Sequence, residues 1–170
     1  DWSSDVCSSD LETAMSLFST IICCVNLTEN SQDIVQYTKD IAKIDNAKIL
    51  VAHSLPSTDN LRNYITSPMV EEVLENSKER TRKFLEEFVA ANFQGFNAEP
   101  VMLSGNPARE LLELVDKRCA DLVIMGSMST KGFFSFLFSR PSESVIGNTR
   151  VPVMVIPNDL SLECTPPEDF

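Results

Sequence analysis

The chain has 170 residues, of which 43% are hydrophobic and 23% are charged, as is usual for a single globular domain. Its net charge of −11 argues against nucleic acid or an anionic membrane surface as the main partner. The sequence contains no apolar run of the roughly 18 residues that a membrane helix needs. Five cysteines without paired spacing indicate buried thiols in a reducing compartment, so we expect a cytoplasmic protein.

The two ends of the chain differ in composition from its body. Residues 1–14 (DWSSDVCSSDLETA) resemble a translated sequencing-adapter fragment, and we expect them to be a non-native leader. Residues 158–170 contain four acidic residues and two adjacent prolines, which predicts an acidic disordered tail. The folded α/β domain is therefore predicted over residues 15–157.

Short apolar runs alternate with amphipathic stretches along the body of the chain. The apolar runs are rich in β-branched residues and end at Gly, Pro, Asn or Ser, a pattern typical of strands buried in a parallel sheet. We predict strands over residues 19–26, 48–54, 98–103, 121–125 and 151–156. Pro100 interrupts the third of these strands, which favours an edge position for it.

Helices are predicted between the strands. The first begins at an N-cap at Asn30 or Ser31 and ends near Asp45. Prolines at 68 and 107 open the next two helices, and a short fourth helix covers residues 141–148. In the long second helix we expect one apolar face, made of Val70, Val73, Leu74, Ser77, Thr81, Phe84, Leu85 and Phe88.

This alternation predicts an α/β domain with a doubly wound, five-stranded parallel sheet and helices on both faces. If the first two crossovers step one way and the third returns beside the first strand, the strand order is 3-2-1-4-5. The direction of winding then reverses between the first and fourth strands, where open α/β sheets bind ligands. The carboxyl ends at that point are Asn26-Leu27 and Gly126-Ser127.

The Gly126-Ser127 turn offers backbone N–H groups and a hydroxyl to an anion, although a single glycine also suits a plain strand-to-loop turn. His53 ends a buried strand without a Ser-His-Asp pattern or a second metal ligand, which favours a structural role. Cys23 and Cys24 must point to opposite faces of their strand, so we expect two core thiols. The sequence offers neither a catalytic set nor a metal site.

Several segments, taken in order, resemble the universal stress protein family: IICCVNLTENS, VAHS, LSGNPARELLELV, DLVIMGS and VPVMVIP. The resemblance covers roughly residues 18–157. It implies a flavodoxin-like sheet, a homodimer formed through the last strand, and no enzymatic mechanism of its own. The last strand would then supply the dimer interface with Val151, Val153 and Val155.

The resemblance also implies an ATP site, with Mg²⁺, at the first and fourth strands, and this chain departs from it. Asn26 stands where ATP-binding relatives have an adenine-contacting Asp, and Leu27 replaces a small residue. Gly126 is kept, but Ser129 and Ser139-Arg140 replace the remaining glycines and a small hydroxyl residue. We therefore expect an altered or vestigial nucleotide pocket formed by Asn26, Ser54, Gly126, Ser127, Ser129, Ser139, Arg140 and Ser142.

Two other functions stay open at this point. A nucleotide-hydrolysing enzyme on the same fold would need a base near the phosphates, and only Glu143 is close in sequence. A ligand-free protein-interaction dimer would use the apolar segment Phe133–Phe138 to bind a protein partner, since four phenylalanines in six residues exceed what a short amphipathic turn needs.

Overall fold

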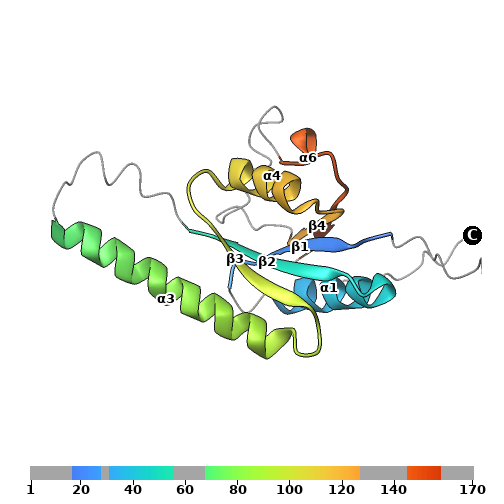
Figure 1. Ribbon diagram of the computed structural model, residues 1–170, viewed down its shortest axis with the longest axis horizontal. Coiled ribbons are helices and arrows are strands. Elements are labelled where there is room, and N and C mark those ends of the chain that lie inside the picture. Colours follow the sequence, from blue (N-terminus) through green and yellow to red (C-terminus); the bar gives the residue numbers. More distant parts are fainter. Residues whose placement is uncertain (1–16, 28–30, 56–67, 127–144, 158–170) are drawn as a thin grey trace, which may run out of the picture.

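The computed structural model describes residues 17–27, 31–55, 68–126 and 145–157. Five parallel strands form one sheet in the order β3-β2-β1-β4-β5, as predicted (Figure 1). The strands are β1 (Thr20–Cys24), β2 (Lys48–Ser54), β3 (Ala98–Leu103), β4 (Leu122–Gly126) and β5 (Val153–Ile156). The helices are α1 (Gln32–Asp45), α3 (Pro68–Asn92), α4 (Pro107–Arg118) and α6 (Val145–Asn148).

Helices cover both faces of the sheet. Figure 1 shows α1 and α3 on one face and α4 with α6 on the other. Successive side chains of a strand point to opposite faces, so β1 sends Ile21 and Cys23 toward α1 and α3, and Ile22 and Cys24 toward α4. The centre of the sheet is therefore buried on both sides, which explains why β1, β2 and β4 contain continuous apolar runs. The two thiols lie in separate halves of the core, as predicted.

Two carboxylates accept hydrogen bonds from backbone N–H groups at the start of β1, the central strand. Asp121 Oδ2 accepts hydrogen bonds from the backbone N–H groups of Ser19 and Thr20 at 2.7 and 2.9 Å. Asp45 Oδ2 accepts from the N–H groups of Leu17 and Phe18 at 2.8 and 2.9 Å. These N–H groups precede or begin the β1 ladder, so the two acids fix where the chain enters the sheet.

Pro68 and Pro107 begin α3 and α4, as predicted; of the two N-caps predicted for α1, Asn30 lies outside the described residues and Ser31 needs a correction. Pro107 begins α4, and the Asn106 side chain caps it by accepting from the N–H groups of Ala108 and Arg109. Ser31 does precede α1, but its backbone is helical (φ −84°, ψ −4°) and its side chain makes no capping hydrogen bond. Its hydroxyl is used elsewhere, as described below.

The apolar face of α3 differs from the predicted one. Leu85 and Val89 are buried in the core, whereas Val73 and Phe84 are 61% and 53% exposed. From Glu71 to Phe84 no side chain of the helix is fully buried. Figure 1 shows the first turns of α3 extending beyond the strands, where they have no sheet to cover. Phe84 comes later, directly before buried Leu85, and is exposed because it points about 100° away from that core-facing residue.

No helix among the described residues is long and apolar enough to cross a membrane.

Candidate functional site

The carboxyl ends of β1 and β4 lie side by side at the middle of the sheet. The two strands pair in register, with Cys24 opposite Met125. The helix that follows β1 is α1, on one face, and the next described helix after β4 is α6, on the other. Neighbouring strands whose connections leave toward opposite faces open a crevice at their carboxyl ends. This is the place that the sequence predicted for a ligand.

Asn26 follows β1 at this crevice and is exposed. The hydroxyl of Ser31, itself 1% exposed, donates a hydrogen bond to Asn26 Oδ1 at 3.0 Å. Ser31 therefore orients the Asn26 amide from the first turn of α1. The amide carries both donors and an acceptor, so it can meet the edge of a purine base in more than one way.

Leu27 has a left-handed backbone, with φ at 58°. Residues other than glycine occupy this region at a cost of about 1–2 kcal/mol, because Cβ approaches a carbonyl oxygen. The Leu27 side chain is half-buried and packs against the core on the α1 side. The small residue expected here from the family resemblance suits this backbone, and leucine, by its size, is predicted to narrow a pocket at this edge of the sheet.

His53 links the ends of β2 and β1. Its Nδ1 lies 2.9 Å from the backbone oxygen of Val25, the residue before Asn26. Burial lowers the pKa of His53, and the hydrogen bond to Val25 opposes this with a smaller effect. A neutral imidazole that donates from Nδ1 fits this geometry, so His53 positions the β1 terminus, as expected of a structural histidine.

The remaining predicted residues divide between the interior and the part of the chain outside the described ranges. Ser54 is 4% exposed and its hydroxyl donates to the Leu55 backbone oxygen at 3.2 Å. Gly126 is buried at the end of β4. Outside the described residues lie Ser127, Ser129, Ser139, Arg140, Ser142, Glu143 and the segment Phe133–Phe138.

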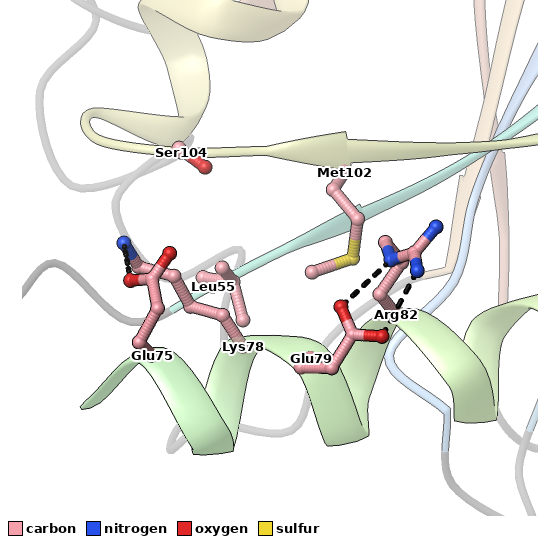
Figure 2. A pocket seen from close by; sticks show the side chains of 7 residues that line it. All are labelled: Leu55, Glu75, Lys78, Glu79, Arg82, Met102 and Ser104. Carbon is pink, nitrogen blue, oxygen red and sulfur yellow. Dashed lines mark hydrogen bonds and ion pairs between the residues drawn. The ribbon is translucent and has the colours of Figure 1, made fainter. Parts of the chain in front are cut away.

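A concave feature lies at the carboxyl ends of β2 and β3, beside α3 (Figure 2). It is a cavity of about 230 Å³ with Leu55 and Met102 as apolar lining and Ser104 at its edge. The α3 side contributes two acids and two bases, in the pairs Glu75–Lys78 (3.0 Å) and Glu79–Arg82 (2.9 Å).

These ion pairs decide what the α3 cavity suits. Its charges are equal in number and already paired, so it has no net attraction for a phosphate group. Two of its seven lining residues, Leu55 and Met102, are apolar. Sequence reasoning missed this cavity because acids and bases three and four residues apart are typical of a solvated helix face.

Burial determines the chemistry of the two core thiols, Cys23 and Cys24. Burial raises the pKa of Cys23 to about 12, and burial, with a smaller contribution from Cys23, also raises the pKa of Cys24. Both thiols are therefore protonated and unreactive. Within the described ranges no group of three or more His, Cys, Asp or Glu side chains could hold a metal ion.

Comparisons with known proteins agree with the architecture. A universal stress protein from Thermus aquaticus is 26% identical over 141 residues, covering 82% of this chain and 99% of the relative. A universal stress protein solved in complex with cAMP matches with a TM-score of 0.51 and 19% identity over 84% of this chain and 98% of its own. The Archaeoglobus fulgidus protein in complex with dAMP matches with a TM-score of 0.55 and 19% identity over 82% and 98%.

The two solved structures are too distant in sequence to show more than the fold, which they share with this chain across nearly their whole length. The family assignment comes from the sequence itself. The model of the universal stress protein family matches residues 17–157, which include every strand and helix described above. The chain therefore belongs to the universal stress protein family.

Proposed function

We propose that this chain is a regulatory or binding module with an altered nucleotide pocket at the carboxyl ends of β1 and β4. The observation that carries the proposal is the pairing of these two strands, which brings Asn26 and Gly126 to the same edge of the sheet. The nucleotides named in the two structural relatives, cAMP and dAMP, favour a ligand with an adenine base.

In this proposal Asn26 and Ser54 flank the base. The segment from Gly126 to Ser142 surrounds the phosphates, with hydroxyls from Ser127, Ser129, Ser139 and Ser142 and a cation from Arg140. Serine in place of glycine adds a Cβ where backbone must approach phosphate closely, so we expect weaker binding than in a glycine-rich loop. Arg140 compensates in part, because its fixed charge and planar donors suit phosphate oxygens. ATP with Mg²⁺ is the ligand we propose first.

Calorimetry with ATP, cAMP and dAMP, each with and without Mg²⁺, tests this pocket. We expect ATP to bind and Arg140→Ala to weaken it by about tenfold, the usual loss for one charged contact. Arg150→Ala is the matched control, because Arg150 is an exposed arginine outside the proposed pocket. Unchanged affinity in Arg140→Ala would remove Arg140 from the site. No binding of any of the three nucleotides would favour the ligand-free interaction module.

We also propose that a second copy pairs with β5. Val151, Val153 and Val155 are half-buried against the α4 side of the core, and β5 pairs with β4 on one side. Among the described residues no strand pairs with its other side, so its backbone groups can form an antiparallel ladder with the same strand of a partner.

Main-chain pairing through β5 is tested with Val155→Pro, which removes a backbone donor, and Val155→Ala, which keeps it. We expect the proline variant to lose the dimer that forms through β5 and the alanine variant to keep it in sedimentation equilibrium, with unchanged circular dichroism in both. Equal behaviour of the two variants would contradict a main-chain interface.

We also propose a cytoplasmic location, which fits the free thiols of Cys23 and Cys24.

A further inference from the structure

The backbone on both sides of Asn26 is held by contacts with the rest of the domain. Val25, before it, donates its N–H to the backbone oxygen of Ala52 at 2.9 Å, and its own oxygen lies 2.9 Å from His53 Nδ1. Leu27, after it, packs against the core on the α1 side. The Cα of Asn26 is therefore fixed, and the torsion angles of its own side chain decide where the amide points.

The hydroxyl of Ser31 sets the orientation of that amide. It donates to Asn26 Oδ1 at 3.0 Å, and Ser31 is only 1% exposed. Rotating the amide by half a turn would replace the acceptor of this buried hydroxyl with the Nδ2 donor group, and a buried donor that loses its acceptor is costly. The amide is therefore held with Oδ1 toward Ser31 and with Nδ2, on its other branch, directed away from Ser31.

This orientation changes what Asn26 can recognise on a purine base. The aspartate that the family resemblance implies at this position has only acceptors when ionised, which suits the 6-amino group of adenine and repels a 6-oxo group. Nδ2 of Asn26 is a donor and needs an acceptor on the base. A ring nitrogen of adenine and the 6-oxygen of guanine or hypoxanthine are both acceptors of this kind.

We propose that Asn26, positioned by Ser31, reads the base through its Nδ2 donor, so that the pocket takes 6-oxopurine nucleotides as well as adenine nucleotides. The inference rests on the nucleotide pocket proposed above and adds to it the residue that selects the base. Asn26 touches the base in this proposal, and Ser31 is a positioning residue that acts through Asn26.

Calorimetry of the full chain with ATP and ITP tests the base preference. ITP is the suitable probe because it differs from ATP only in its 6-oxo group and in the hydrogen on the neighbouring ring nitrogen. We expect the two affinities to lie within about threefold of each other, since Nδ2 makes one hydrogen bond to either base. Asn26→Asp should favour ATP over ITP by ~10-fold or more, because its carboxylate accepts from the 6-amino group and repels the 6-oxygen.

The ratio of the two affinities is the measured quantity, because the added charge of Asn26→Asp repels both triphosphates equally. Asn97→Asp is the matched control: it makes the same substitution at an exposed residue just before β3, at the opposite edge of the sheet, and should leave the ratio unchanged.

The positioning role of Ser31 is tested separately. In Ser31→Ala the amide is free to rotate and to present Oδ1 to the 6-amino group of ATP, so the ratio should move toward ATP by ~5-fold. Ser31→Thr keeps the hydroxyl and should keep the original ratio. The side-chain amide resonances of Asn26, assigned by their loss in Asn26→Asp, should shift in Ser31→Ala without nucleotide and in the original chain when ITP binds.

The outcomes separate this inference from the pocket on which it rests. A preference of the original chain for ATP by tenfold or more, or an unchanged ratio in Ser31→Ala, would overturn the role of Asn26 and Ser31 and leave the nucleotide pocket in place. Failure of both ATP and ITP to bind would refute the pocket itself and this inference with it.

Discussion

The left-handed backbone at Leu27 predicts a reversal of the usual order of alanine and glycine stabilities. At an ordinary helical position, glycine is less stable than alanine by about 1 kcal/mol, because it loses more conformational entropy on folding. At φ 58° alanine retains the steric cost of a Cβ, about 1–2 kcal/mol, and glycine does not. Offsetting these effects leaves Leu27→Gly more stable than Leu27→Ala by up to about 1 kcal/mol.

Urea denaturation of the two variants measures this difference, because both lose the same half-buried side-chain packing beyond Cβ. The matched control is Gln36, an exposed residue inside α1, where the Ala variant should exceed the Gly variant by about 1 kcal/mol. If alanine were the more stable residue at both positions, the left-handed conformation of Leu27 would carry no cost and our account of this turn would be wrong. A higher nucleotide affinity in Leu27→Gly than in the original chain would also support the narrowing of the crevice.

Three further predictions concern other parts of the structure. Asp121→Ala should lower the free energy of unfolding, measured by urea denaturation, by about 2 kcal/mol, because two N–H groups at the start of β1 lose their carboxylate acceptor. Glu87→Ala, at an exposed residue, is the control, and an equal loss in the two variants would contradict this prediction. The pKa of His53 is lowered by folding, so below about pH 6.5 the unfolded chain binds more protons than the folded chain, and the free energy of unfolding should decrease on acidification. His53→Gln should make the free energy of unfolding less dependent on pH, and an unchanged pH dependence would exclude His53 as its source. Mass mapping after alkylation of the native protein should find Cys119 modified well before Cys23 or Cys24, since Cys119 is exposed and the other two are buried; equal rates would show that the core opens.

The sheet could be predicted from the sequence because its signals are local and agree with one another. Each strand is an apolar run with clear ends, and Pro100 correctly marked β3 as an edge strand. The central position of β1 was predicted on the condition that the third crossover returns beside it, and its pairing with β4 confirms this. Cys23 and Cys24 fell on opposite faces because the strand period is two.

Other features depend on where an element ends relative to its neighbours, which periodicity does not encode. In α3, the spacing of Val73 and Phe84 is compatible with one broad apolar face, but the core-facing side is the one that carries Leu85 and Val89. Val73 lies in the first turns, which extend beyond the strands, and Phe84 points about 100° away from Leu85. Serine is a usual N-cap residue, yet the hydroxyl of Ser31 donates to Asn26 Oδ1 at the other end of the same β1–α1 connection instead of capping the helix. The base side of the predicted pocket falls within the described chain at Asn26 and Ser54, and its predicted phosphate side, from Ser127 to Ser142, lies outside it.

The central place of β1 has a consequence for how the molecule is made. The backbone N–H of Thr20 in β1 donates to Asp121, 101 residues later in the sequence. During synthesis β1 therefore emerges from the ribosome long before β4, the strand that pairs with it. Until β4 is synthesised, a nascent sheet of β1, β2 and β3 would present an apolar strand edge at what becomes the middle of the domain. Long-range parallel pairing of this kind also slows folding. We therefore expect the growing chain to be most prone to aggregation just before residue 122 emerges.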